Sequence, residues 1–202
     1  METQKTGRAL ILVDIQKDFV EGGSLAVTGG KDLATRIADD LLREGHNYDL
    51  VVTTQDWHID PGAHFSEDPD FVNSWPVHCV AKSYGAEILP AIRLALNQLA
   101  VPVVTILKGQ YEDAYSGFMG MDEDKTHLGD ALKRAGIKQV DVAGLALDYC
   151  VAATALDSVI EGFETAVLVD YSVGINADRV AEKKAELLLA GVTLQTLGGI
   201  LG

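Results

Sequence analysis

The sequence has few cysteines, few basic residues and no long apolar run, and each shortage excludes a class of protein. Two cysteines among 202 residues are too few to form a framework of disulfide bonds. Lys and Arg number 16 against 30 Asp and Glu, which gives a net charge of −14. Nucleic acids and anionic membranes require a basic surface, so we expect neither as a partner. The apolar run at residues 9–13 is far too short to cross a membrane.

The amino-terminal segment and the composition favour a cytoplasmic protein. Residues 1–7 are polar and lack the features of an export signal, and the low cysteine content suits a reducing compartment. A chain of this length can bury roughly 70% of its unfolded surface in one domain. The sequence contains no repeat, low-complexity segment or linker, so we expect a single domain over residues 1–202. A monomer and a small homo-oligomer are both compatible with it.

Apolar runs alternate with segments of helical periodicity along the chain. Strands are expected at residues 8–13, 49–54, 101–107, 139–144, 166–169 and 192–197. Helices are expected at residues 30–44, 86–99, 128–135, 148–160 and 177–189, the fourth with Asp148 as its N-cap. Alternating strands and helices form parallel sheets through right-handed crossovers. The sequence therefore predicts a three-layer α/β fold: a doubly wound sheet of about six mainly parallel strands, with helices on both faces.

Reactive side chains stand where several of these strands end. Asp14, Asp56 and Lys108 follow the first three strands, and Cys150 lies at the start of the helix after the fourth. Parallel sheets bind ligands beyond the carboxyl ends of their strands. Any one of these residues alone could be a surface charge or a packed thiol. Their joint placement indicates a reactive site at one edge of the sheet.

Three of the five histidines lie in the 24 residues that begin at Asp56. Asp56 and His58 are two residues apart, so in an extended segment their side chains point the same way and can reach one ion. The Asp-Pro-Gly sequence at residues 60–62 favours a turn that would bring His64 back toward them. Histidines can also cluster on a surface by chance. The spacing together with the proline-fixed loop favours a metal site.

A second part of the same loop completes the expected ligand set. Pro76 holds its neighbours extended, so His78 and Cys79 should face opposite sides. We expect His78 as the fourth ligand and Cys79 as a packed residue. Three imidazoles and one carboxylate suit a transition metal such as zinc, iron or manganese better than calcium or magnesium.

Cys150 is a candidate nucleophile because two neighbours could favour its thiolate. A free thiol has a pKa of about 8.5, and half ionisation at pH 7 requires a shift of roughly 1.5 units. A helix N-terminus and a nearby ammonium, such as that of Lys108, can supply this shift. Asp14 would then accept the proton, with its own pKa raised by burial. An intracellular cysteine is more commonly a small packed residue, and the spacing alone leaves that alternative open.

Several of these segments resemble those of one enzyme family. They are residues 13–19, Asp56-Trp57-His58 with His64, and residues 75–79, 108–109, 114–118 and 144–151. Together they resemble the nicotinamidases, or pyrazinamidases, of the isochorismatase-like cysteine hydrolases, over about residues 8–192. The resemblance implies Cys150 as nucleophile, Asp14 as general base and Lys108 as the cation that holds both. It also implies metal ligation by Asp56, His58, His64 and His78, with water molecules completing the shell.

The resemblance further implies how the substrate is held. It predicts a cis peptide between Leu145 and Ala146 and an oxyanion hole formed by the backbone amides of Ala146 and Cys150. Phe19, Trp75, Tyr115 and Leu145 match residues that line a pocket for a flat ring. One departure is Leu147, which stands where the family frequently has threonine. Tyr149 is at most a pocket wall, and Tyr111 and Phe118 are expected to pack against the core.

The expected activity is hydrolysis of nicotinamide to nicotinate and ammonia through a thioester, with pyrazinamide as a further substrate. Two alternatives remain open at this stage. The chain could be a related amidase for another small substrate, although such relatives generally lack the metal loop. It could also be a homologue that binds a metal or ligand without turnover.

Overall fold

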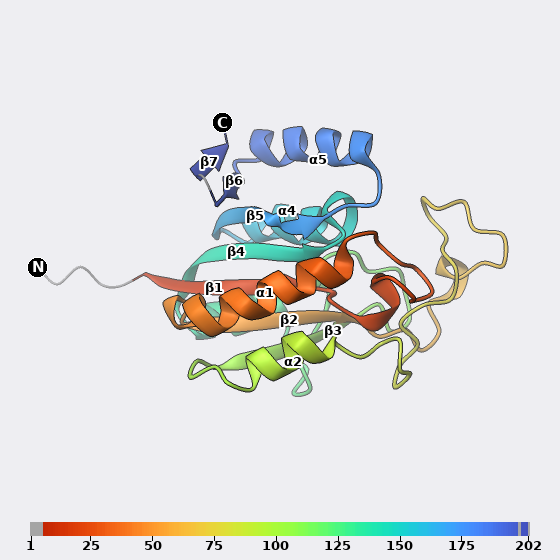
Figure 1. Ribbon diagram of the computed structural model, residues 1–202, viewed down its shortest axis with the longest axis horizontal. Coiled ribbons are helices and arrows are strands. Elements are labelled where there is room, and N and C mark those ends of the chain that lie inside the picture. The colour runs from red at the N-terminus through yellow and green to blue at the C-terminus, as the bar shows by residue number, and fades with distance from the viewer. Residues whose placement is uncertain (1–5, 198, 202) are drawn as a thin grey trace, which may run out of the picture.

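The computed structural model describes residues 6–197 and 199–201, and one twisted sheet runs through its centre (Figure 1). The strand order is β3-β2-β1-β4-β5-β6-β7. The strands are β1 (Gly7–Val13), β2 (Leu50–Asp56), β3 (Val103–Lys108), β4 (Ile137–Leu145), β5 (Glu164–Val173), β6 (Thr193–Thr196) and β7 (Gly199–Leu201). All neighbours from β3 to β6 pair in parallel, and β7 pairs antiparallel to β6. The expected parallel α/β sheet is confirmed.

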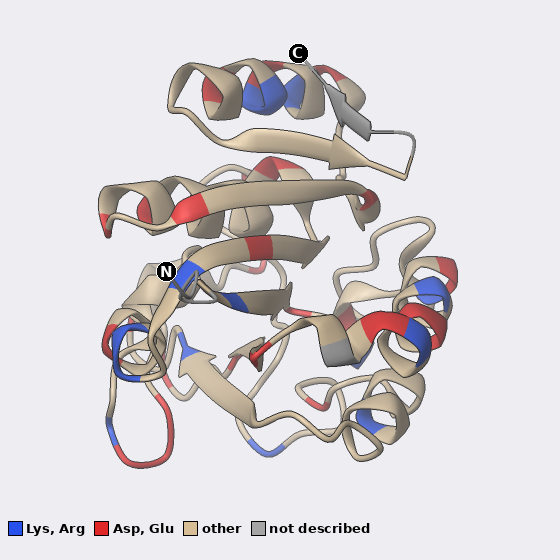
Figure 2. Cartoon of the chain, turned by 90° about the vertical axis from the view of Figure 1, so that its left-hand side faces the viewer, with Lys and Arg blue, Asp and Glu red and all other residues tan. Residues whose placement is uncertain are grey.

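Helices cover both faces of the sheet (Figure 2). They are α1 (Gly30–Glu44), α2 (Pro90–Leu96), α3 (Leu128–Arg134), α4 (Ala152–Ile160) and α5 (Ala177–Leu189). The first two pack on one face and the other three on the opposite face, with a separate apolar core under each layer. Alternate residues of β1 enter the two cores: Ile11 and Val13 face one, and Leu10 and Leu12 face the other. This double burial explains why β1 is apolar at every position from Ala9 to Val13.

Two expected helix starts were wrong. The helix expected from residue 86 begins at Pro90, because proline suits the first helical turn and the preceding chain is extended. In that extended part Ile88 forms a bridge with Gln16. Asp148 is not an N-cap but lies inside a π-helical turn, Leu147–Val151, that precedes α4. Its carboxylate accepts hydrogen bonds from the backbone N–H groups of Ile175 and Asn176 instead.

The carboxyl-terminal part of the sheet extends beyond the expected strands. β5 spans Glu164–Val173, longer than residues 166–169, and β7 was not expected at all. Its three residues follow a short turn and include a glycine, so they carry too little apolar periodicity to identify a strand. Within residues 6–197 and 199–201, none of the helices has the length and apolar character needed to cross a membrane.

Candidate active site

Asp14, Lys108 and Cys150 meet in a buried cluster at the carboxyl edge of the sheet. The Lys108 Nζ atom lies 2.8 Å from Asp14 Oδ2 and 3.7 Å from Cys150 Sγ. Asp14 and Lys108 are each 1% exposed, and Cys150 is 8% exposed. The sequence therefore correctly predicted that strands β1 and β3 and the segment before α4 bring these side chains together.

The backbone and one unexpected residue orient the carboxylate of Asp14. Asp14 has a φ of 50°, which turns the chain away from the direction of β1 at the strand's end. The Thr54 hydroxyl donates to Asp14 Oδ1 over 2.6 Å. Sequence reasoning missed Thr54, whose position opposite Val13 in the parallel register becomes visible only in the structure. Lys108 Nζ also donates to the Ala114 carbonyl over 2.9 Å, so the ammonium is held from several sides.

Burial controls the protonation of this cluster. Burial raises the pKa of Cys150 well above its usual value and outweighs the lowering effect of Lys108. The expected lowering of the thiol pKa was therefore wrong, because the extent of its burial was not foreseen. Burial also raises the pKa of Asp14 despite the nearby Lys108 cation, as expected. Burial opposes the charge on Lys108, but the Asp14 and Asp56 carboxylates raise its pKa well above the usual value. The resting thiol is thus protonated beside a firmly cationic lysine.

The three loop histidines converge on one point, as the loop spacing predicted. One ring nitrogen each from His58, His64 and His78 can be chosen so that all three lie within 4.8 Å of one another. His58 Nδ1 is 2.6 Å from the Gly109 carbonyl and His78 Nδ1 is 2.7 Å from the Pro76 carbonyl. A carbonyl can only accept a hydrogen bond, so both Nδ1 atoms carry protons, and in the neutral rings Nε2 is the atom with a lone pair.

Unsatisfied polar atoms show that this cluster fits a cation. His58 Nε2 and His64 Nδ1 are buried and have no hydrogen-bond partner among the described residues. Two imidazoles pinned by backbone carbonyls, with lone pairs directed inward, are typical of metal ligands. Gly109 permits this packing, because a Cβ at that position would lie 2.7 Å from the His58 ring.

Asp56 joins the histidine cluster to the cluster around Cys150. Its Oδ2 atom lies 3.6 Å from His58 Nε2 and 3.7 Å from His78 Nε2, while Oδ1 accepts a hydrogen bond from Lys108 Nζ. Burial alone would raise the pKa of Asp56, but the charge of the Lys108 ammonium holds it well below its usual value. A carboxylate that stays ionised can serve both a metal ion and the lysine.

The protonation of His64 provides a test of this geometry without metal. Burial, followed by the nearby His78 and His58, lowers the pKa of His64 from 6.5 to about 4. The folded state therefore prefers neutral His64, and this stabilisation is complete above pH 6.5 and is lost as the pH falls toward 4. In chelator-treated protein, we expect the free energy of unfolding to fall less from pH 7 to pH 4 in His64→Asn than in wild type. Urea titrations across this range measure the difference; equal slopes would contradict a buried neutral His64.

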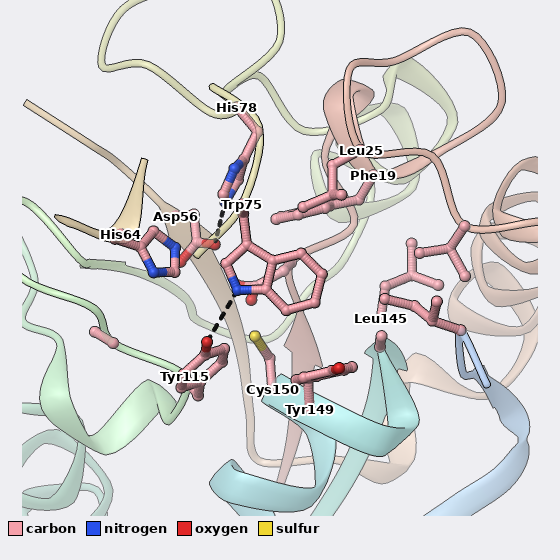
Figure 3. Close-up of a pocket in the computed structure, with 15 residues that line it drawn as sticks. Phe19, Leu25, Asp56, His64, Trp75, His78, Tyr115, Leu145, Tyr149 and Cys150 are labelled. Carbon is pink, nitrogen blue, oxygen red and sulfur yellow. Dashed lines mark hydrogen bonds and ion pairs between the residues drawn. The ribbon is translucent and has the colours of Figure 1, made fainter. Parts of the chain in front are cut away.

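A pocket opens between the two clusters (Figure 3). Its volume is about 460 Å³, with the open mouth included, which suits a small ring compound. The expected residues Phe19, Trp75, Tyr115 and Leu145 all line it, and the Trp75 Nε1 donates to the Tyr115 hydroxyl over 3.0 Å. Tyr149 is indeed a wall. Sequence reasoning missed Leu25, Val27, Ala114 and Ile175, which carry no signal beyond being apolar.

The segment before Cys150 has the expected backbone form. The Leu145-Ala146 peptide is cis, and both residues line the pocket together with Cys150. The function of the Ala146 and Cys150 amides as an oxyanion hole stays a prediction. Cys79 is fully buried and lies outside the histidine group, which fits a packing residue. Phe118 packs against the core as expected, whereas Tyr111 is 68% exposed and does not.

Known proteins share this sequence and this architecture. Residues 8–197 match the profile of the isochorismatase domain. A nicotinamidase/pyrazinamidase of Mycobacterium tuberculosis is 49% identical over 187 residues, which cover 93% of this chain and 97% of the relative. The crystal structure of a pyrazinamidase of Pyrococcus horikoshii in complex with zinc has a TM-score of 0.74 at 32% identity, covering 94% of this chain and 99% of that chain. A protein of L. infantum in complex with nicotinate has a TM-score of 0.78 at 31% identity, covering 96% and 94%.

Proposed function

The chain belongs to the isochorismatase family, and on that premise we propose that it hydrolyses nicotinamide to nicotinate and ammonia. The domain and the curated relatives make it a hydrolase that acts on an amide bond. The substrate is supported by the 49% identical relative, whose name is nicotinamidase/pyrazinamidase. The single observation that supports the proposal best is a thiol, a carboxylate and an ammonium grouped beside three convergent histidines, with members of both clusters lining one pocket. Pyrazinamide, also a flat ring with a carboxamide, is proposed as a second substrate.

The acylation step uses the protonated thiol and the ionised form of Asp14. Asp14 accepts the Cys150 proton as the sulfur attacks the carboxamide carbon, so a neutral thiol is a suitable starting state. Lys108 stays cationic and offsets the negative charge that moves between Asp14 and Cys150. The Ala146 and Cys150 amides stabilise the oxyanion of the tetrahedral intermediate. Asp14 then donates its proton to the amide nitrogen, the C–N bond breaks, and ammonia and a thioester result.

The deacylation step returns the same groups to their starting state. Asp14 accepts a proton from a water molecule as the water oxygen attacks the thioester carbon. The C–S bond breaks, the acid is released, and the Asp14 proton returns to the Cys150 sulfur. Phe19 and Trp75 hold the aromatic ring so that the carboxamide faces the thiol, and such positioning lowers the barrier by reducing the entropy lost in the attack.

A divalent transition metal completes the proposed site. Asp56, His58, His64 and His78 would hold it, and their donor atoms suit zinc, iron or manganese. When bound, the ion would supply a Lewis acid for the ring nitrogen of the substrate or for a water molecule. One equivalent of such an ion per chain, measured by elemental analysis of the purified protein, would support this part of the proposal.

Ammonia release and the acyl-enzyme test the activity and its intermediate. We expect the purified enzyme to release ammonia from nicotinamide and pyrazinamide, and an acid-quenched reaction to show the mass of a nicotinoyl group on the peptide that contains Cys150. Benzamide lacks the ring nitrogen and should react more slowly. Ammonia release without any adduct under single-turnover conditions would argue against the thioester. No release from either amide would favour a related amidase with another substrate, or a binding protein without turnover.

A further inference from the structure

The side chain of Gln16 forms hydrogen bonds with both backbone groups of Asp56. Gln16 is fully buried. Its Oε1 atom accepts from the Asp56 N–H over 2.8 Å, and its Nε2 atom donates to the Asp56 carbonyl over 2.8 Å. The same Nε2 atom donates to the Ala86 carbonyl over 2.9 Å. One carboxamide thus satisfies three buried backbone groups from two distant segments.

The path of β1 explains why a side chain is needed here. The parallel pairing of β1 with β2 ends at Val13 and Thr54, two residues before β2 itself ends at Asp56. Asp14 turns away with its φ of 50°, and its carbonyl accepts from the Gln16 N–H over 2.8 Å rather than continuing the ladder. The Gln16 carboxamide has the same donor and acceptor as a peptide group. It takes the place of the missing β1 residue beside Asp56.

The other neighbour of Asp56 is β3, which pairs with it in register at Lys108. The backbone of Asp56 is therefore held on both sides, by a strand and by a side chain. Its carboxylate projects from this fixed backbone toward Lys108 on one oxygen and toward His58 and His78 on the other. Figure 3 shows the side that faces His78. A small rotation of the Asp56 backbone would shift both oxygens at once.

We propose that Gln16 is a positioning residue that holds Asp56 so that one carboxylate can bind the metal ion and Lys108 together. The inference rests on the proposed metal site. Only an amide side chain offers a donor and an acceptor in this geometry. Methionine would leave the N–H and the carbonyl of Asp56 without their partner. Glutamate would place an oxygen, which can only accept when ionised, against the carbonyl oxygens of Asp56 and Ala86. Outer hydrogen bonds of this kind typically change metal affinity without contacting the ion.

A neighbouring glutamine provides a matched control. Gln55 Nε2 donates to the same Ala86 carbonyl over 2.8 Å, but no hydrogen bond joins its side chain to Asp56. The variants Gln16→Met and Gln55→Met therefore remove similar groups and disturb the same carbonyl. Only the first removes the hydrogen bonds to Asp56, so the difference between the two variants isolates their effect.

The test measures metal binding by the chelator-stripped full-length protein. Competition with a chromophoric chelator gives the zinc dissociation constant, and the visible spectrum of the cobalt(II) protein reports the coordination geometry. We expect Gln16→Met to bind zinc about 10- to 100-fold more weakly, with an altered cobalt spectrum, whereas Gln55→Met matches wild type in both. Thermal unfolding of the stripped proteins shows how much stability each substitution removes.

Each outcome decides the inference. Equal loss of zinc affinity in both variants would overturn it, because the hydrogen bond to the Ala86 carbonyl, which both variants lose, would then explain the effect. Wild-type affinity and spectrum in Gln16→Met, even with a lower melting temperature, would reduce Gln16 to a structural residue. If Gln16→Met does not fold, Gln16→Glu is compared with Gln55→Glu in the same assays. A wild-type protein that hydrolyses nicotinamide but binds no zinc or cobalt would overturn the inference and leave the proposed activity standing.

Discussion

Replacing Cys150 by alanine is expected to lower ammonia release from nicotinamide by about 10⁴-fold or more, because the nucleophile of a covalent mechanism has no substitute. The sulfur lies 3.7 Å from Lys108 Nζ and lines the pocket. Its removal leaves Asp14 without a thiol proton to accept, so the bound amide meets no attacking group. The measurement is the steady-state rate of ammonia release, with zinc content and thermal unfolding recorded for the same preparation.

Cys79 provides the control for this substitution. It is the other cysteine of the chain, it is fully buried, and burial raises its pKa well above the usual value. Its N–H donates to Asp18, but its sulfur is not part of the pocket. We expect Cys79→Ala to lose stability through the small cavity it creates and to keep most of its activity. Full activity in Cys150→Ala, or an inactive but folded Cys79→Ala, would contradict the assignment.

Lys108→Met should produce the largest loss of stability among single substitutions at the site. Lys108 is the cation between two buried carboxylates, those of Asp14 and Asp56. Breaking a buried ion pair by removing one partner typically costs about 3–5 kcal/mol, because the remaining charge stays buried without compensation. The variant should also be inactive, since no cation then offsets the charge on Asp14 and Cys150. Urea unfolding of the metal-free proteins measures the difference in free energy.

An exposed lysine serves as the control, because its substitution also removes an ion pair but leaves no buried charge. Lys133 pairs with Glu161 at the surface, and both side chains are at least 40% exposed. Such pairs contribute about 1 kcal/mol or less, so Lys133→Met should unfold close to wild type. If Lys108→Met were as stable as Lys133→Met, Asp14 and Asp56 would not depend on Lys108 for their burial.

The sequence identified those parts of the fold and site that depend on local patterns. The apolar run of β1 revealed a strand buried on both faces, and the alternation of strands and helices gave the parallel sheet. Parallel sheets bind ligands beyond the carboxyl ends of their strands. Asp14, Asp56 and Lys108 stand at three such ends, so they were predicted to lie together. The convergence of the loop histidines could be predicted for a similar reason, because the turn and the proline that bring them together lie within the loop itself.

The features that were missed depend on contacts between distant segments. Thr54 orients Asp14 across 40 residues, and Gln16 reaches Asp56 across 40 and Ala86 across 70. No periodicity or motif in the sequence predicts which residues these two side chains contact. The protonation of Cys150 was misjudged because a sequence shows a helix start and a nearby lysine but not the degree of burial. The π-helical turn before α4 was hidden for the same reason, since its hydrogen bonds depend on the packing around Cys150.

The chain contains two tryptophans, Trp57 and Trp75, and the second lines the pocket. Trp57 stands between Asp56 and His58, and its backbone N–H donates to the Lys108 carbonyl, while Trp75 is 5% exposed. No indole elsewhere contributes to the ultraviolet emission of the molecule. Half of the indoles thus line the pocket, so a ligand that quenches Trp75 can be followed in real time by tryptophan emission without a label.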